Sequence, residues 1–334
     1  MVGRNGFPGH RGIGLAFLVL LLFFHVCAFA QDRKMVRIGV IRSVAIPVLE
    51  INQNGFEAAL AGAGLKAGVN VTYDVQTVGG DPERAQAIVQ KFLADKVDLI
   101  HSIGTTPTLA ALKATSSVPV VFSAVTDPVG AGIVPAGAMP GKPSGMNVTG
   151  ISDRWPVTLQ LETYAKIVPH AKKWGTMYNP AETNSVVQVR LMRDAARQLG
   201  LELVEMTVDG TNETRAVALA LAAKVQAIFI ISDSTVSADI QSVVDACQSR
   251  QIPFFTGSSG SLSRGALAAF GIDYFLAGYA AGKKAALVLR GIPPGHIPWN
   301  LAEHFGLVLN QKAAKALGIV IPADMLRIAD RVVE

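Results

Sequence analysis

The chain has 334 residues, half of them hydrophobic, and a formal net charge of +5. A chain of this length and apolar content can bury a large core and usually divides into two lobes. No cluster of Lys and Arg of the kind that follows phosphates stands out in it, so we expect no nucleic-acid partner.

The first 30 residues have the pattern of an export signal. Arg4 and Arg11 give a positive start, an apolar run begins at Ile13, and Ala28–Ala30 ends with the small-x-small pattern that signal peptidase accepts. The run is shorter than the roughly 20 residues that span a bilayer, which disfavours the alternative of a retained membrane anchor. We therefore predict a cleaved signal peptide at residues 1–30 and a periplasmic protein.

Cysteine usage excludes an intrachain disulfide after export. Removal of residues 1–30 would leave a net charge of +3 and Cys247 as the one cysteine. Cys247 lies in an apolar stretch of helical character, which favours a buried structural thiol. The alternative, a catalytic cysteine, would need a His and an electropositive pocket nearby in the fold. We expect no lipid anchor at Cys27, because Val26 occupies the position before the cysteine where lipoprotein signal sequences have a small residue.

Short apolar runs alternate with amphipathic stretches along the rest of the chain. Most of the runs are rich in Val, Ile and Phe, as in strands buried on both faces of a parallel sheet. The predicted strands are Val36–Ile41, Asn70–Gln76, Asp98–Ile103, Val118–Ser123, Asn147–Ser152, Lys173–Tyr178, Glu202–Thr207, Ala227–Ser232, Pro253–Thr256 and His304–Leu309. The predicted helices are Pro47–Ala63, one opened by Asp81-Pro82, one opened by Thr106-Pro107, Asn184–Leu199, Leu276–Leu289 and Gln311–Leu317.

The alternation of strands and helices occurs twice, at residues 36–123 and 173–256. It predicts an α/β protein with two doubly wound, Rossmann-like lobes, joined by hinge strands and with a cleft between them. We expect the N-terminal lobe to hold residues 35–150 plus about 275–298. We expect the C-terminal lobe to hold residues 151–274 plus about 299–334.

Five loops rich in small hydroxyl side chains follow predicted strands. In an open parallel sheet, ligands bind beyond the carboxyl ends of the strands. Several of the loops lead into helices, whose N-termini suit a carboxylate, and Asp233 could balance an ammonium group. Each such residue could also be a plain helix cap. Five loops of one character at the same edge of two sheets favour a binding site for a zwitterion.

Motifs of the common enzyme classes are absent from the sequence. It has no Walker-type phosphate loop and no H-E-x-x-H, and Gly257-Ser258-Ser259-Gly260 is not a nucleophile elbow. The histidines at 101, 170, 296 and 304 lack metal-ligand spacing. We therefore expect no enzyme activity, no cofactor and no metal.

Several longer stretches occur in a characteristic order. They are Asn70-Val71 to Gly80-Asp81-Pro82, Pro119–Gly132, Asn147–Asp153, Tyr178–Ser185, Ser232–Thr235, Gly271–Tyr274 and Ala313–Pro322. Their combination resembles the ABC transporter substrate-binding proteins of the tryptophan/tyrosine-type group, which have the type I periplasmic-binding fold.

This resemblance implies two lobes that close on an amino acid, and the implied ligands include aromatic amino acids. In the first lobe it implies ligand contacts from Thr105, Thr106, Ser123, Thr126 and Asp127. In the second lobe it implies contacts from Asn184, Ser185, Asp233, Ser234, Thr235, Asp273 and Tyr274.

We predict the periplasmic solute-binding component of an ABC importer. It would be a monomer that closes by a hinge on a small amino-acid-like ligand and then docks on a permease in the inner membrane. One alternative is a sensing module that presents the same clamp to a signalling receptor. Another is a secreted α/β enzyme, which would need a nucleophile–base pair that we do not find in the sequence.

Overall fold

The computed structural model describes residues 1–3, 6 and 35–334. The predicted signal peptide and Cys27 therefore lie outside the described residues, apart from residues 1–3 and 6. Residues 36–334 form one compact unit. In the described part of the chain, no helix is both long enough and apolar enough to cross a bilayer.

A six-stranded parallel sheet organises the first half of this unit, with the strand order β11-β5-β4-β3-β1-β2. Its strands are β1 (Val36–Arg42), β2 (Val71–Thr77), β3 (Leu99–Ile103), β4 (Val120–Val125), β5 (Val148–Ser152) and β11 (Asn300–Leu301). Strands β3, β4 and β5 are buried along their whole length, as expected where helices cover both faces of a parallel sheet.

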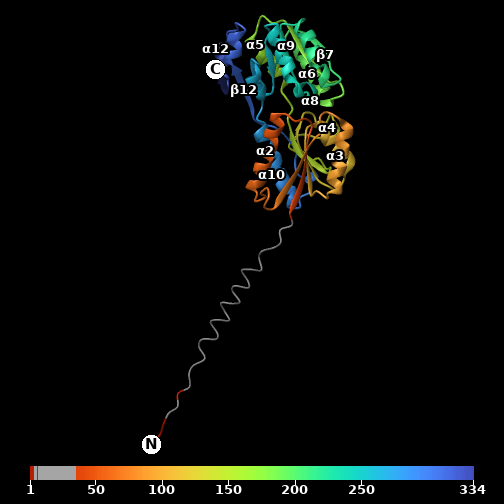
Figure 1. The fold of residues 1–334 in the computed structure, drawn as a ribbon, viewed down its shortest axis with the longest axis vertical. Coiled ribbons are helices and arrows are strands. Elements are labelled where there is room, and N and C mark those ends of the chain that lie inside the picture. The colour runs from red at the N-terminus through yellow and green to blue at the C-terminus, as the bar shows by residue number, and fades with distance from the viewer. Residues whose placement is uncertain (4–5, 7–34) are drawn as a thin grey trace. The chain divides into compact units, whose positions relative to one another are not determined.

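Two pairs of helices cover this first sheet (Figure 1). On one side lie α3 (Pro82–Ala94) and α4 (Thr105–Ala114), and on the other lie α2 (Pro47–Gly62) and α10 (Tyr274–Leu289). Asp81 caps α3 through the N–H groups of Glu83 and Arg84, with Pro82 in the first turn. The predicted start of this helix is thereby confirmed.

A seven-stranded sheet organises the second half, with the strand order β13-β12-β10-β9-β8-β6-β7. Its strands are β6 (Lys173–Tyr178), β7 (Glu202–Thr207), β8 (Ala227–Ile230), β9 (Phe254–Thr256), β10 (Ala268–Ile272), β12 (Phe305–Asn310) and β13 (Arg331–Val333). Its helices are α5 (Val157–Ile167), α6 (Thr183–Gln198), α7 (Thr214–Ala222), α8 (Ser234–Ala238), α9 (Ile240–Ser249), α11 (Gln311–Ala316) and α12 (Ala323–Ile328). All of its strand pairs are parallel except β10 with β12.

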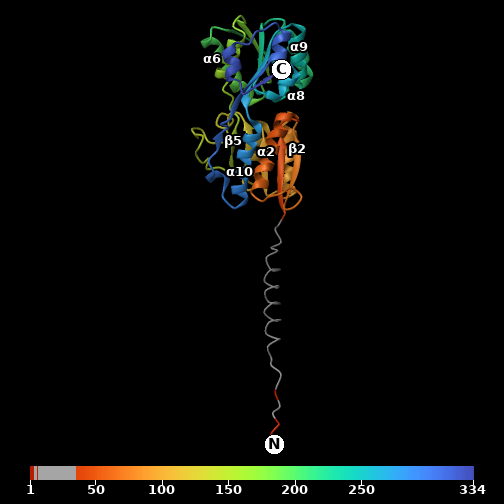
Figure 2. The ribbon, with the colours of Figure 1, turned by 90° about the vertical axis from the view of Figure 1, so that its left-hand side faces the viewer.

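The chain passes between the two sheets three times: from β5 to α5, from β10 to α10, and from β11 to β12 (Figure 2). The two helix-covered sheets and these crossings confirm the predicted two-lobed, doubly wound fold. The first sheet extends to Ser152 and includes β11, slightly beyond the expected limits at 150 and 298. The exact lobe boundaries stay a prediction.

Glycines bring α10 into close contact with α2, and the two helices lie side by side in Figures 1 and 2. A Cβ added at Gly278 would lie 1.8 Å from the backbone oxygen of Asn52. One added at Gly55 would lie 2.0 Å from the backbone oxygen of Phe275. Because the two backbones nearly touch, α10 is held tightly against the first lobe although it follows a strand of the second.

Candidate functional site

The carboxyl ends of strands from both sheets border one cavity of about 60 Å³. Seven predicted site residues line it: Thr105, Thr106, Thr126, Asn184, Asp233, Ser234 and Tyr274. Five predicted site residues do not line it: Ser123, Asp127, Ser185, Thr235 and Asp273. The structure thus brings residues of both lobes together at the edge that the sequence indicated.

Ser123 is buried inside the first lobe. Its hydroxyl donates to Asn52 Oδ1 at 2.6 Å and lies 2.8 Å from His101 Nε2. It therefore accepts the hydrogen on His101 Nε2. Burial lowers the pKa of His101 to about 3, so the ring is neutral. Asn52 Nδ2 in turn donates to the backbone oxygen of Tyr274 at 3.1 Å, so Ser123 helps to join the sheet to α2 and α10.

The other four residues outside the cavity have local partners. Asp127 forms an ion pair with Arg154 at 2.7 Å, and Asp273 caps the first turn of α10. The Ser185 hydroxyl donates to a carbonyl oxygen of the second lobe, and the Thr235 hydroxyl donates to a carboxylate there. A direct role of these four side chains in ligand binding stays a prediction.

Asp233 caps the short helix α8 at the border of the cavity. One carboxylate oxygen accepts the Asn179 N–H at 2.7 Å and the other accepts the Val236 N–H at 2.8 Å. Burial, and then repulsion by the Glu182 carboxylate, raise the pKa of Asp233 from 3.8 to about 7. Both oxygens are thus occupied by backbone donors, and a contact with a ligand ammonium stays a prediction.

The raised pKa of Asp233 predicts a pH-dependent stability. Its folded-state pKa lies above the value of 3.8 for the unfolded chain, so the folded state binds the proton more tightly. The free energy of unfolding should therefore fall as the pH rises from about 4 to about 7. Asp233→Asn should flatten this fall in urea denaturation series, whereas Asp245→Asn, at an exposed helix position, should not. An unchanged slope in Asp233→Asn would contradict the assignment.

Asp153 is a buried carboxylate that faces the cavity, with only 2% of its surface exposed. Its Oδ1 accepts from Thr126 Oγ1 at 3.2 Å, and its Oδ2 accepts from the Tyr274 hydroxyl at 2.7 Å. Burial raises its pKa. Among the described residues, no Lys, Arg or His forms an ion pair with it. A buried anion without a cationic partner is unfavourable, so a cation in the cavity would be bound strongly.

A bulge at the end of β4 shapes this part of the cavity. The register of β4 against β5 shifts between Ser123 and Val125, and Ala124 has a φ of +52°. Such bulges are common next to binding sites, where they redirect side chains. Here the bulge is followed by Thr126, whose hydroxyl reaches Asp153 just after β5.

The N-terminus of α4 contributes backbone donors to the same cavity. No side chain caps this ten-residue helix, and Thr105 and Thr106 of its first turn line the cavity. Its N-cap is Gly104, with a φ of +108°, where an added Cβ would lie 2.9 Å from Ser43 Oγ. Uncapped N–H groups at a helix start suit a carboxylate.

An apolar wall completes the cavity. It consists of Trp155 from the second lobe together with Val44, Ile46, Val48 and Leu49 from the first. The Trp155 indole N–H donates to the Tyr274 hydroxyl at 3.2 Å. The indole ring packs so closely on Gly257 that an added Cβ there would lie 2.5 Å from it.

The sequence reasoning missed Asp153, Trp155 and the hydroxyl of Ser43, all of which line the cavity. Asp153 directly follows β5, which is buried, so the rule used for the other loops would have found it.

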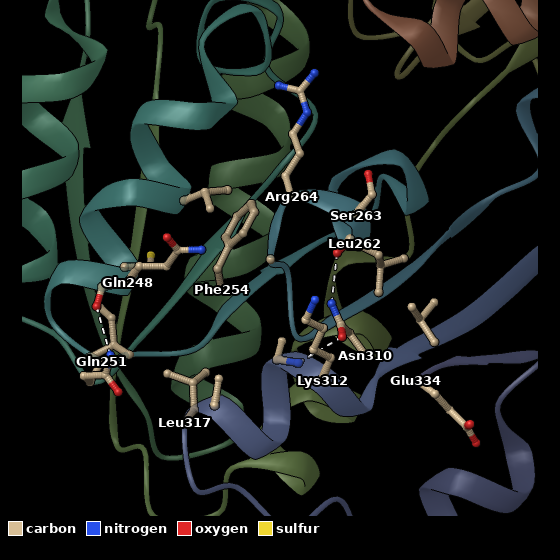
Figure 3. Close-up of a pocket in the computed structure, with 17 residues that line it drawn as sticks. Gln248, Gln251, Phe254, Leu262, Ser263, Arg264, Asn310, Lys312, Leu317 and Glu334 are labelled. Atoms are coloured by element: carbon tan, nitrogen blue, oxygen red, sulfur yellow. Dashed lines mark hydrogen bonds between the residues drawn. The ribbon is translucent and has the colours of Figure 1, made fainter.

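A larger cavity of about 650 Å³ lies within the second lobe (Figure 3). Phe254, Leu262 and Leu317 line it, and the side-chain amide of Asn310 donates to the backbone oxygen of Leu262. Cys247 also lines it but is buried, which raises the pKa of its thiol to about 12. The predicted structural role of this thiol is consistent with both observations. In the described residues, no cluster of His, Cys, Asp and Glu could hold a metal ion.

Comparisons with known proteins agree with this architecture. A family model described as ABC transporter substrate binding protein matches residues 37–333. A tyrosine-binding protein from Clostridioides difficile (strain R20291) is 35% identical over 287 residues, which cover 86% of this chain and 82% of the relative.

Two solved structures at nearly equal identity differ in how well they superpose. The ABC domain from Streptococcus pneumonia in complex with L-Trp is 32% identical with a TM-score of 0.85, covering 90% of this chain and all of that one. The ligand-free, open substrate binding protein with adhesive properties from Clostridium difficile is 33% identical with a TM-score of 0.66, covering 90% and 99%. The extent of the family match and the curated relative together show that this chain belongs to the ABC transporter substrate-binding proteins.

Proposed function

We propose that the protein binds one aromatic α-amino acid between its lobes and delivers it to an ABC importer. The observation that carries this proposal is Asp153, a buried carboxylate at the cavity with no cationic partner among the described residues. The tyrosine-binding relative and the L-Trp complex support the ligand class. The predicted signal peptide, periplasmic location and monomeric state belong to the same proposal.

Three parts of the cavity would each bind one part of the ligand. Asp153 would bind the ammonium group, and the uncapped N-terminus of α4 would bind the carboxylate. The aromatic side chain would lie against Trp155 and the apolar residues of the first lobe. Among the predicted site residues, Thr105 and Thr106 belong to the first turn of α4, and Thr126 and Tyr274 donate hydrogen bonds to Asp153.

Hinge closure is the mechanism that the geometry supports. The cavity of about 60 Å³ is far smaller than the about 300–1,000 Å³ typical of ligand sites, so the lobes must separate to admit a ligand. Two contacts join the lobes here: Gln188 Nε2 with Thr126 Oγ1 at 3.4 Å, and Ser234 Oγ with Ser43 Oγ at 3.5 Å. The higher TM-score with the ligand complex than with the open structure supports a closed arrangement.

A set of matched ligands tests the proposal. L-Trp and L-Tyr should raise the melting temperature of the exported protein by amounts that grow with concentration. Tryptamine lacks the carboxylate and indole-3-propionate lacks the ammonium, so each should bind at least about 30-fold more weakly, because each leaves a polar group of the site unpaired. Equal binding of these analogues, or binding of sugars or nucleosides alone, would overturn the proposal.

Two further measurements separate import from the alternatives. Loss of labelled amino-acid uptake on deletion of the gene supports import, and unchanged uptake favours ligand sensing. Recovery of unaltered ligand after long incubation with the protein argues against the enzyme alternative, and a converted ligand would support it.

A further inference from the structure

We infer that Asp153 senses occupancy of the cleft: its unpaired charge disfavours closure of the empty protein, and Gln188 links that charge to the opposite lobe. The inference deepens the proposed function and rests on it only in assuming that the ligand carries a positive charge. It can be tested on the protein without ligand, because it concerns how far the empty lobes close.

The hydrogen bonds around Asp153 have a fixed direction. The Trp155 indole nitrogen can only donate, so the Tyr274 hydroxyl accepts from it and donates to Asp153. On the other side, Thr126 donates its hydroxyl hydrogen to Asp153 Oδ1. Two neutral hydroxyl donors therefore meet the carboxylate, and the described residues provide no positive charge.

Gln188 connects this group to the second lobe. Its side chain is fully buried on α6, and its Oε1 accepts the Ser232 N–H at 3.2 Å. Because a backbone N–H needs an acceptor, the amide nitrogen must face the other way, toward Thr126 Oγ1 at 3.4 Å. Thr126 Oγ1 therefore accepts from Gln188 while it donates its own hydrogen to Asp153. The contact across the cleft thus joins the second lobe to a hydroxyl that is bonded to the carboxylate.

The balance of solvation makes closure depend on a cation. In the closed cleft Asp153 loses nearly all contact with water, since Asn184 and Ser232 of the second lobe border the same cavity. With the lobes apart, water would reach the carboxylate from that side. A ligand ammonium would compensate the charge most strongly in the closed form, where water no longer screens the carboxylate. A difference of this kind between two states is what allows a ligand to shift the equilibrium between them.

Asp245 provides a control for this reasoning. It lies at an exposed position of α9, outside the cavity. Its carboxylate is in contact with water whether the lobes are apart or together, so its charge should not affect closure.

Small-angle X-ray scattering of the empty exported protein tests the inference, after bound ligand has been removed by unfolding and refolding. The empty Asp153→Asn variant should have a smaller radius of gyration than the empty wild type, close to that of the wild type saturated with L-Trp. Empty Asp245→Asn should scatter like the empty wild type. Empty Asp153→Asn with the radius of the empty wild type, or equal compaction in Asp245→Asn, would overturn the inference.

A second variant tests the part assigned to Gln188. Gln188→Leu keeps the size of the side chain but removes both hydrogen bonds, so it should reverse the compaction of empty Asp153→Asn when the two changes are combined. A double variant as compact as Asp153→Asn would contradict the link, and melting curves check that each variant is folded. If the wild type binds no aromatic amino acid, the proposed function fails, whereas the comparison of empty proteins still decides the inference.

Discussion

Asp153→Asn should weaken the binding of L-Trp or L-Tyr by about 30-fold to a few thousandfold without lowering the melting temperature of the empty protein. Removal of one partner from a buried charge pair reduces binding by about 2–5 kcal/mol, and 1.4 kcal/mol corresponds to a factor of ten. Within residues 35–334 the carboxylate has no cationic partner, so its neutral replacement relieves an unfavourable burial in the empty protein.

Titration calorimetry and thermal melting of the same samples measure the two effects. Asp127→Asn is the matched control, because Asp127 forms an ion pair with the exposed Arg154 outside the cavity. Its effect on affinity should stay within about fivefold, since exposed ion pairs contribute about 0–1 kcal/mol. Equal losses of affinity and of stability in Asp153→Asn would show that the carboxylate has a structural role instead.

Gly278→Ala should destabilise the protein by about 1–3 kcal/mol or more, the usual effect of forcing an extra carbon into a packed core. The new Cβ would lie 1.8 Å from the Asn52 backbone oxygen, so α10 and α2 would have to move apart. The shift would also disturb the bond from the Asn52 side chain to the Tyr274 backbone at the start of α10.

Urea denaturation measures this change, provided that the free energy of unfolding depends equally steeply on urea concentration in the variant and the wild type. Gly62→Ala, at the end of α2, is the control, because the nearest atom to its new Cβ is the Tyr279 hydroxyl at 3.9 Å. That substitution should stabilise the protein by about 0.4–1 kcal/mol by restricting the unfolded chain. Similar effects of the two substitutions would argue against a close helix contact.

Elements with strong local signals could be predicted from the sequence. The strand β1 and the helix α3 are predicted correctly because a short apolar run and an Asp-Pro helix start are local patterns in the sequence. The strand β10 was missed because Ala268–Ile272 is rich in Ala and Gly. It becomes a strand through its pairing with β9 and β12, which residues far apart in the sequence provide.

The site residues likewise include some that local sequence features predict and others that they do not. Residues beside helix starts, such as Thr105 and Asp233, could be found because loops at strand ends are local features. The sequence could not separate capping from ligand binding at Asp233, since the same side chain suits both. The role of Gln188 could not be predicted either, because it lies in mid-helix and meets Thr126 only when two distant parts of the chain come together.

The late position of α10 and β11 affects the order in which the chain can acquire structure. Both complete the first lobe, yet they lie at Tyr274–Leu289 and Asn300–Leu301. During synthesis, the apolar surface of α2 therefore stays uncovered until almost the whole polypeptide has been made. We expect such a delay to keep the first lobe from folding early, which would suit the export that we propose for this protein.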